Sequence, residues 1–465
     1  MSSPSADRLP GPRGLPLLGS VFALRRDPLR FLQAVDAEHG PLARFRLGPH
    51  RATLINEPAA IEELLRHDVE DYRKGFGNEV LRPLIGGGLF LAEGEAWRRQ
   101  RAAVQPLFQS ANLARLAPCV QARTAELLDA WEPRARSGAP FDVHAELRGL
   151  TLRILSVGLV GSDVFESDAG LRDTLEEVWN LTNERVAPRF PWLLALQPRR
   201  NARFRRGLDR LHAAVGRAIA ARRAAGGPPE EGLDLLAILL GSRGRDGRAL
   251  EDGAVRDEVL TFLVAGMECT AIALSWALYL LARHQEEERQ LRGELGDAPP
   301  DLAAVRRLPR LGRVVEETLR LYPPAWLLAR QSTRPVELGG HAFPEGSILF
   351  VAPWVTHRDP RLWSEPERFD PDRFAGPGAA APPFAYLPFG GGARTCVGRP
   401  LALFLVRGIL AMLLQRYRFE LAGNRRVVPD PRLTLRPRGG LPVVLRPVSA
   451  PPGLPVTPWD RAGRR

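Results

Sequence analysis

The feature that most constrains the fold is a nearly continuous apolar run at residues 259–282. As an α-helix it would be roughly 36 Å long, which is enough to cross a bilayer. However, Gly266 and Glu268 lie near its middle, and charged segments flank it on both sides. Because a carboxylate is costly inside lipid, the run predicts a long buried core helix and not a membrane span.

The sequence around this run indicates a mostly helical body with a small sheet region. Helical periodicity dominates from residue 58 to about residue 295, and an amphipathic helix precedes it at 28–38. A β-hairpin is expected at 42–56. Further short strands are expected at 336–338, 347–351, 433–435 and 443–445. Since these strands do not alternate with helices, we predict a mainly α fold, a single large helical domain with a small β-rich region.

No internal repeat or long linker divides the 465 residues, so we expect one domain at 9–448. Residues 1–8 and 449–465 are rich in Ser, Pro, Gly and Arg and lack periodicity, and we expect both to be disordered tails. The first nine residues have no apolar core of the kind that a signal peptide or a membrane anchor requires. We therefore expect no membrane anchor and a cytoplasmic location.

The charge and the cysteine content exclude several classes of function. The net charge is +12, almost wholly from arginine, and Lys74 is the only lysine. No basic run carries interleaved aromatic residues, so nucleic-acid binding is not expected, and a basic patch for an acidic redox partner fits better. An odd number of cysteines in a long chain argues against a disulfide framework and suits a reducing compartment. Two of the three, Cys119 and Cys269, are expected to be small buried side chains.

The third cysteine, Cys396, stands in the segment 389–398, which reads Phe-Gly-Gly-Gly-Ala-Arg-Thr-Cys-Val-Gly. Glycines let backbone N–H groups approach a sulfur closely, which moderates the charge of a metal-bound thiolate. Phe389 is placed to cover the sulfur, and Arg394 supplies a fixed cation for a nearby carboxylate. The alternative is a glycine-rich turn around a buried structural cysteine, which the number of specified positions makes improbable.

The pattern Phe-x-x-Gly-x-Arg-x-Cys-x-Gly resembles the cysteine loop of the cytochrome P-450 (heme-thiolate monooxygenase) superfamily, soluble bacterial type. The resemblance implies that Cys396 ligates the iron of heme b and that Phe389, Gly392, Arg394 and Gly398 surround the cofactor. It implies insertion of one oxygen atom from O2 into an organic substrate. No flavin or iron–sulfur domain is apparent, so electrons are expected from a separate ferredoxin and ferredoxin reductase.

A second motif, Glu-Thr-Leu-Arg at residues 317–320, precedes the cysteine loop on an expected helix. Glu317 and Arg320 share a helix face, and taken alone they predict no more than a weak surface ion pair. In the resembled family such a pair is locked by an arginine from a Pro-x-Arg-Phe element. Two such elements follow, and we assign the role to Arg373, with Arg368 as the alternative. The resemblance implies a buried structural network that retains the heme.

The resemblance also points to side chains for the heme propionates. Trp97 and Arg101 are four residues apart on an expected helix, and Arg330 follows the helix that carries the Glu-x-x-Arg motif. With Arg394 they provide three arginines for two carboxylates, a pairing that suits the planar, permanently charged guanidinium. The alternative for Arg101 is an amphipathic helix with a solvated arginine stripe.

The middle of the apolar run resembles the oxygen-activating segment of the family. Ala265 and Gly266 match its small pair, and Glu268 matches the acid that relays protons with a neighbouring alcohol. Cys269 occupies the position of that alcohol, and Thr270 follows one residue later.

Three explanations for this departure remain open. Local unwinding brings Thr270 into the relay, the substrate or water replaces the hydroxyl, or coupling is poor and peroxide escapes. A separate alternative is that Glu268 only caps a kink in the helix.

The substrate is expected to be a hydrophobic small molecule, terpenoid-like or fatty. The apolar segment at 78–90, with Leu84, Ile85 and Leu89, and the pair Trp326 and Leu327 are expected to lie over the heme. Residues 321–330 and 434–442 look somewhat like bacterial members that act on terpenoids and carotenoids.

Two rival functions are kept. One is a heme-thiolate enzyme that uses peroxide or needs no redox partner, and the other is a heme-binding sensor without turnover. The histidines show no metal-ligand spacing and are interpreted as structural.

Overall fold

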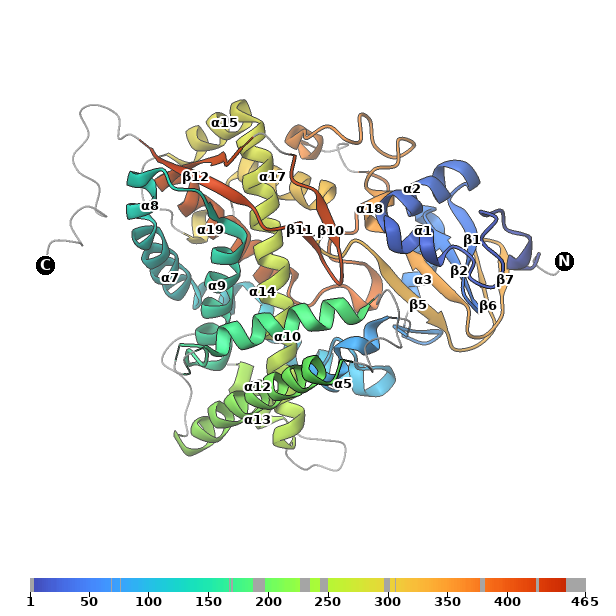
Figure 1. Cartoon of the computed structure of the whole chain (residues 1–465), viewed down its shortest axis with the longest axis horizontal. Helices are drawn as coiled ribbons and strands as arrows, with labels where there is room; N and C mark the ends of the chain where they lie inside the picture. Colours follow the sequence, from blue (N-terminus) through green and yellow to red (C-terminus); the bar gives the residue numbers. More distant parts are fainter. Residues whose placement is uncertain are drawn as a thin grey trace, which may run out of the picture.

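The computed structural model is organised around α14 (Asp252–Arg283), the helix that the apolar run forms. By length and composition this helix is able to cross a membrane, but 78% of its most apolar window is buried inside the protein. It passes through the middle of the helical body, with other helices on several sides (Figure 1). The expectation of a long buried core helix is therefore confirmed. The structure describes residues 4–448 except 68, 76, 167, 169, 187–196, 226–234, 243–249, 297–301, 306, 377–380 and 424–425.

The helical body packs directly on α14. Its most extensive neighbour is α9 (Val143–Leu155), and α12 (Pro198–Ala225), α17 (Pro309–Leu321) and α19 (Arg399–Arg416) also contact it. The other helices of the body are α4 (Arg82–Ile85), α5 (Gly94–Val104), α6 (Ser110–Ala114), α7 (Ala117–Ala130), α8 (Glu132–Ser137), α10 (Leu171–Val186), α13 (Leu235–Gly241), α15 (Gln285–Leu295) and α16 (Leu302–Val305). A π-helical segment, Ser156–Val160, follows α9.

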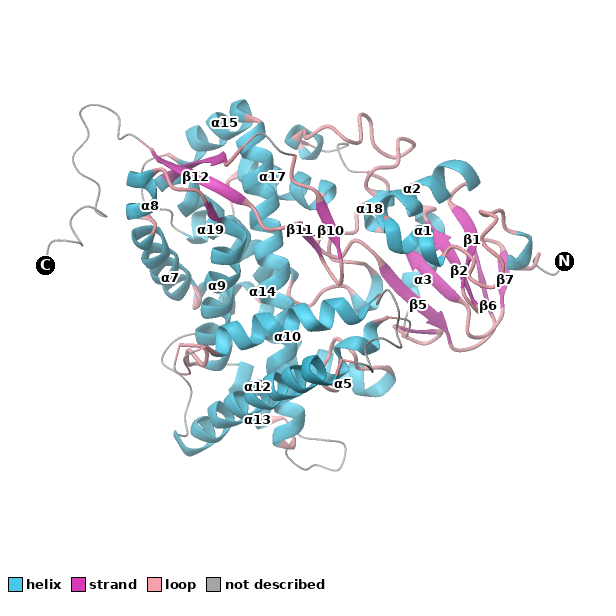
Figure 2. Cartoon of the chain, viewed as in Figure 1, coloured by secondary structure: helices cyan, strands magenta, loops and turns pink. Residues whose placement is uncertain are grey.

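A five-stranded sheet forms a second lobe at one end of the molecule (Figure 2). Its order is β1 (Leu42–Leu47), β2 (His50–Ile55), β8 (Ile348–Val351), β5 (Leu328–Ser332) and β3 (Tyr72–Arg73). The expected hairpin is confirmed, because β1 and β2 pair antiparallel with Leu47 opposite His50. The β2–β8 pair is parallel and the other pairs are antiparallel. The helices of this lobe are α1 (Val21–Arg26), α2 (Pro28–His39), α3 (Pro58–Arg66) and α18 (Pro353–Thr356).

Three smaller sheets complete the fold. The first has three strands in the order β4 (Phe141–Asp142), β12 (Pro442–Pro447) and β9 (Tyr417–Leu421). The other two have two strands each, β10 (Pro429–Pro431) with β11 (Leu435–Pro437), and β6 (Val336–Leu338) with β7 (His341–Phe343). Short 3-10 helices lie at Ala6–Arg8, Asn78–Leu81, Gln105–Phe108, Pro371–Phe374 and Gly392–Arg394. The mainly α fold with a small β-rich region is therefore confirmed.

One large hydrophobic core includes buried residues from Leu29 to Leu445, and a smaller core lies between α3 and the large sheet. The expected single domain at 9–448 is consistent with a core that draws on so much of the chain.

The N-terminal segment corrects one expectation. We expected residues 1–8 to be disordered, but Ser5 pairs with Ala342 and Ala6 is buried in the smaller core. This correction concerns residues 4–8, because residues 1–3 lie outside the described part of the chain. The C-terminal tail expected at 449–465 lies outside the described residues.

Candidate functional site

The backbone of the cysteine loop is closed by its own hydrogen bonds. The N–H of Cys396 donates to the carbonyl of Phe389 at 2.9 Å, and the N–H of Thr395 donates to the carbonyl of Gly392 at 3.2 Å. The loop ends at Gly398, the residue before α19. The sulfur is thus presented at the N-terminus of a long helix, where free N–H groups are concentrated.

Glycine is required at one position of this loop by both conformation and space. Gly392 has a φ of +64°, and a Cβ built on it would lie 2.0 Å from the carbonyl oxygen of Leu65 in α3. No side chain fits so close to backbone, so the loop packs against the sheet lobe only with glycine here.

The surroundings of the Cys396 sulfur act on its pKa in opposite directions. The Cys396 side chain is exposed, so a ligand can reach the sulfur. The protein packed around it still displaces part of its water, which disfavours the charged thiolate and raises the pKa of the thiol. The N–H groups of Gly398 and Arg399 and the charge of Arg101 lower it. Such donors moderate the charge of a metal-bound sulfur.

An accessible stripe on α14 faces the cysteine loop. Between residues 258 and 281, all of which the structure describes, only Phe262, Ala265, Gly266 and Cys269 are not buried. Their spacing places them on one helix face. Cys269 is therefore half-buried and not buried as expected, whereas Cys119 is buried. Loss of water around the Cys269 sulfur raises the pKa of its thiol to about 12, and the charge of Cys396 adds to this rise. The one accessible face of the central helix is therefore directed toward Cys396.

Three of the expected propionate residues, Trp97, Arg101 and Arg394, lie at the cysteine loop. The guanidinium of Arg394 lies over the ring of Trp97, 5.1 Å from the ring centre, and forms an ion pair with Glu93. Arg101 donates to the carbonyl of Thr395 at 2.6 Å. Arg101 is therefore not part of a solvated stripe, because its guanidinium is bound to the loop that holds Cys396.

Arg330, the third expected propionate arginine, belongs to the sheet lobe. It lies on β5, is 7% exposed, and donates to the carbonyl of Ala329 at 2.9 Å.

The structure turns Glu268 away from the accessible stripe. Its carboxylate lies 3.1 Å from the guanidinium of Arg148 on α9 and accepts a hydrogen bond of 3.2 Å from Thr434. Arg148 in turn donates to Glu176 at 2.9 Å, near the surface. The carboxylate of Glu268 thus has a charged partner and a hydroxyl partner on other elements, and α14 runs unbroken through this position, so there is no break in the helix for it to cap.

Thr270 is buried, and α14 is a continuous α-helix from Asp252 to Arg283. Neighbouring residues on a helix lie roughly 100° apart, so Thr270 does not share the face of Cys269. Local unwinding, one of the three explanations for the absent alcohol, does not occur in this structure.

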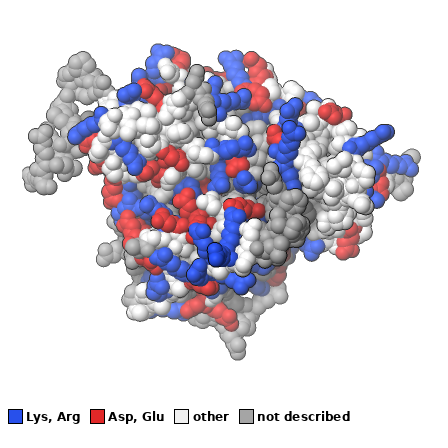
Figure 3. All heavy atoms as spheres, viewed as in Figure 1, with Lys and Arg blue, Asp and Glu red and all other residues white. Residues whose placement is uncertain are grey.

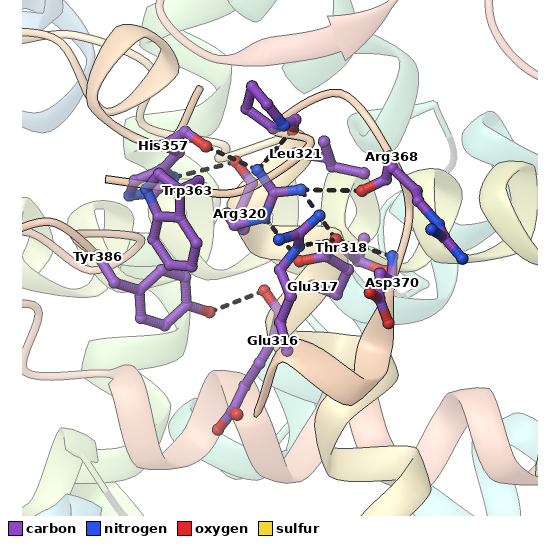
Figure 4. A network of polar contacts seen from close by, with 12 residues as sticks. Glu316, Glu317, Thr318, Arg320, Leu321, His357, Trp363, Arg368, Asp370 and Tyr386 are labelled. Atoms are coloured by element: carbon purple, nitrogen blue, oxygen red, sulfur yellow. Dashed lines mark hydrogen bonds and ion pairs between the residues drawn. The ribbon is translucent and has the colours of Figure 1, made fainter. Parts of the chain in front are cut away.

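The Glu-x-x-Arg motif forms a buried network on α17 (Figure 4). Glu317 and Arg320 are both 0% exposed and form a two-pronged ion pair at 2.6 and 2.8 Å. Arg320 also donates to the carbonyls of His357, Pro366 and Arg368 at 2.7 to 3.1 Å. All five N–H groups of this guanidinium are thereby used.

Arg373 rather than Arg368 brings its side chain to this network. The guanidinium of Arg373 lies 3.4 Å from Glu317, whereas that of Arg368 pairs with Glu365 at the surface. Arg368 contributes only its carbonyl.

His357 joins the network to the cysteine loop. One ring nitrogen lies 3.0 Å from the carbonyl of Arg320, and the other accepts the N–H of Leu387, two residues before Phe389, at 2.7 Å. This pattern fixes the neutral ring, with the proton on Nδ1. Burial lowers the pKa of His357 to about 3, so the link holds at neutral pH.

Comparison with known proteins identifies this arrangement. A family model described as cytochrome P-450 matches residues 9–442. The chain belongs to the cytochrome P-450 family. It is a heme-dependent monooxygenase that uses O2.

The curated relatives of this cytochrome P-450 include three enzymes from Streptomyces. Cyclooctatin synthase from Streptomyces melanosporofaciens is 34% identical over 430 residues, which cover 91% of this chain and 92% of the relative. Cyclooctat-9-en-7-ol 5-monooxygenase from the same organism is 34% identical and covers 88% and 89%. Pentalenene oxygenase from Streptomyces avermitilis is 32% identical and covers 90% and 92%.

Solved structures share the fold. Retinoic acid-bound cyanobacterial CYP120A1 superposes with a TM-score of 0.84 at 26% identity, covering 96% of this chain and all of that one. The heme domain of cytochrome P-450DA superposes with a TM-score of 0.82 at 23% identity, covering 97% and 98%.

The residues present fit a heme. A single sulfur faces the accessible stripe of α14, and small residues, Ala265 and Gly266, form the middle of that stripe. Among the described residues no cluster of three or more His, Cys, Asp and Glu could hold a bare metal ion. A metal with one protein ligand, carried by a flat prosthetic group, fits this donor set.

The expected substrate residues lie in two places. Leu84, Ile85 and Leu89 are buried in the large core, in the segment that approaches the N-terminal half of α14. Trp326 is 8% exposed and its ring N–H donates to the carbonyl of Arg432 at 2.9 Å. Leu327 beside it is half-buried.

Sequence reasoning missed three polar contributors. Arg148 binds Glu268, and Glu93 binds Arg394. Glu258 on α14 accepts the N–H of Leu89 at 3.1 Å, and burial raises its pKa to about 7. Glu258 ends the charged segment 256–258 that precedes the apolar run, so nothing in the sequence distinguishes it from its charged neighbours. Partners such as Arg148 are set by tertiary packing.

The network makes a prediction about its third member. Arg373→Ala should lower the free energy of unfolding by about 2 kcal/mol, the usual range for a hydrogen bond to a buried charge, and should reduce heme content. Arg368→Ala is the matched control and should change stability by less than about 0.5 kcal/mol, as surface substitutions do. Urea denaturation and the heme-to-protein ratio measure both. Equal losses in the two variants would contradict this assignment.

His357 predicts a specific pH dependence. Its folded pKa of about 3 lies below the unfolded value of 6.5, so only the unfolded chain binds the proton between these pH values. Stability therefore falls with falling pH, by about 2 kcal/mol between pH 6.5 and pH 5 from this group.

Urea titrations at pH 7 and pH 5 measure the effect in the native protein and in His357→Gln. The variant should be less stable at pH 7 but should lose less on acidification. His144, also buried with a pKa lowered to about 3, contributes equally to both proteins and cancels. The same pH slope in both would show that His357 is not responsible.

Proposed function

We propose that this cytochrome P-450 oxygenates an apolar terpenoid-like molecule, or a fatty one, with heme b and electrons from a ferredoxin and its reductase. The observation that carries the proposal is the accessible stripe of α14, which faces Cys396 and is bordered by apolar side chains. The names of three relatives, which act in cyclooctatin and pentalenene metabolism, favour the terpenoid class.

The chain's own residues would hold the cofactor in defined ways. Cys396 ligates the iron, and Arg101, Arg330 and Arg394 bind the propionates, with Trp97 packed beneath Arg394. When bound, heme supplies oxygen activation, which a thiolate ligand assists by favouring O–O cleavage. The N–H of Gly398 would lie close to the sulfur, Gly392 lets the loop pack against α3, and the carbonyl of Phe389 accepts the N–H of Cys396.

The distal residues determine how protons arrive. A thiol at Cys269 with a pKa of about 12 stays neutral at pH 7 and is a weaker hydrogen-bond donor than a hydroxyl. Glu268 would relay protons only after its ion pair with Arg148 opens. Since Thr270 is on another face, water or a substrate hydroxyl is the donor that best fits the stripe.

The substrate would lie between α14 and two apolar segments. Leu84, Ile85 and Leu89 border it on one side and Trp326 and Leu327 on the other. The backbone of residue 87 donates to Asp257 at 2.9 Å, which ties the first segment to α14. Such apolar walls with few polar groups suit a hydrocarbon skeleton.

Partners and location follow the bacterial relatives. Enzymes of this family type generally receive electrons from separate proteins, and we propose a ferredoxin with its reductase. We place the enzyme in the cytoplasm.

A second function is favoured by one observation. Glu268 is held by Arg148, and its neighbour is a thiol. Both features weaken proton delivery to oxygen, whereas peroxide brings its protons with it. A peroxide-driven enzyme is therefore the second candidate.

The reaction is tested with purified enzyme and a panel of cyclic terpenes and terpene alcohols. We expect product only with O2 and a reduced ferredoxin system, detected as a mass increase of one oxygen atom. Cys396→Ser should lose both the thiolate-type carbon-monoxide spectrum and the product. Turnover with peroxide alone, and none with O2 and reduced ferredoxin, would establish the second candidate instead.

Cys269 makes a prediction about coupling. Cys269→Thr should raise the fraction of consumed electrons that appears in product severalfold, because a hydroxyl donates and accepts stronger hydrogen bonds than a thiol and so orders a proton-delivering water better. Peroxide release should fall correspondingly. Cys119→Thr, at a buried cysteine of α7, is the matched control and should leave coupling unchanged. Unaltered coupling in Cys269→Thr would show that water or substrate bypasses this position.

A further inference from the structure

Exposed apolar side chains gather in one short segment near the N-terminus. Among the described residues the large apolar side chains that are exposed are Leu15, Leu17, Leu18, Phe22, Phe90, Val428 and Val448. The first four, here named the N-terminal apolar patch, lie within eight positions, and their exposed fractions are 55%, 83%, 44% and 54%. Single exposed leucines are ordinary, but a cluster marks an interaction site.

The backbone holds this patch in a fixed turn. Leu15 and Gly19 exchange two hydrogen bonds of 3.0 and 2.8 Å, and Gly19 pairs with Leu47 at the edge of β1. Leu17 stands at the tip with a φ of +60°, a conformation that costs a leucine energy. Because the Leu17 side chain is exposed, its burial within the protein does not offset this strain. The conformation therefore points to a contact of Leu17 with another molecule.

Positive charge borders the patch. Arg8, Arg13, Arg25 and Arg26 are all exposed within the same stretch of chain. Figure 3 shows an uncharged area over the lobe that carries α1, with Lys and Arg side chains and some Asp and Glu side chains around it.

The nearby acids are engaged within the protein. Asp7 pairs with Arg44 and Arg51, and the carboxylate of Asp27 accepts the N–H of Arg30 at the start of α2. The border of the patch therefore presents mainly positive charge outward.

We propose that the N-terminal apolar patch docks this enzyme on the surface of an anionic lipid bilayer. Leucine and phenylalanine side chains enter the interface, while the arginines contact acidic headgroups. A second copy of the chain is the less suitable occupant, because a two-fold contact through this patch would bring the arginine borders together. Docking rests on the surface alone and does not depend on the proposed substrate.

The test is co-sedimentation of the full-length holoenzyme with vesicles of phosphatidylcholine, with and without phosphatidylglycerol. We expect binding to the anionic vesicles that weakens with salt. The double variant Leu17→Ser/Phe22→Ser should bind at least about tenfold more weakly, given the transfer free energy of two large apolar side chains. Arg13→Gln/Arg26→Gln should lose the preference for phosphatidylglycerol. Val428→Ser, at an exposed valine elsewhere, should bind like the native protein.

Because the substituted side chains are exposed, the variants should retain the native heme spectrum and melting temperature. Absence of vesicle binding by the native protein would overturn the proposal, as would equal binding by Leu17→Ser/Phe22→Ser. Sedimentation velocity without lipid distinguishes the other occupant. A native dimer that this variant converts to a monomer, with no change in vesicle binding, would assign the patch to self-association.

Discussion

The guanidinium of Arg320 is the interaction on which the proximal half of the molecule depends. Burying such a cation costs several kcal/mol unless its donors are satisfied. Here all five N–H groups have acceptors, two on Glu317 and three on backbone carbonyls between residues 357 and 368. One side chain thereby holds a long irregular segment against α17. His357 extends the same network to Leu387. The position of the cysteine loop therefore depends on the buried guanidinium of Arg320.

The distal half depends on a different constraint, which is the close approach of α9 and α14. A Cβ on Gly266 would lie 2.8 Å from the side chain of Leu155. Thr151 on α9 donates to the carbonyl of Met267 at 3.1 Å. Both contacts fix the rotation of α14 about its axis. That rotation decides which residues face Cys396, and it leaves the small residues in the middle of the helix on the accessible side.

Local sequence patterns predicted the helices and strands well, but they predicted the long-range partners of individual side chains less well. The apolar run, the hairpin and the Glu-x-x-Arg helix each carry a periodic signal, and all three form where expected. The preference for Arg373 over Arg368 rested on resemblance alone, since the two Pro-x-Arg-Phe elements are locally alike. Arg148 could not be predicted as the partner of Glu268, because 120 residues separate them. The ordered residues 4–8 were missed because their partner strand β7 is more than 300 residues away.

The exchange of alcohol for thiol at Cys269 has a physical consequence for Glu268. A hydroxyl beside an acid can accept the proton of the acid and pass it on, and this transfer requires a carboxylate that is free to move. A thiol does so poorly, and the carboxylate here is instead fixed by Arg148 and Thr434. The ion pair of Glu268 with Arg148 fits the presence of a thiol at position 269. An acid that has no hydroxyl partner for proton transfer can serve as a structural ion instead. Under the proposed function, proton supply would pass to water or to a hydroxyl of the substrate, so the choice of substrate would affect the chemistry.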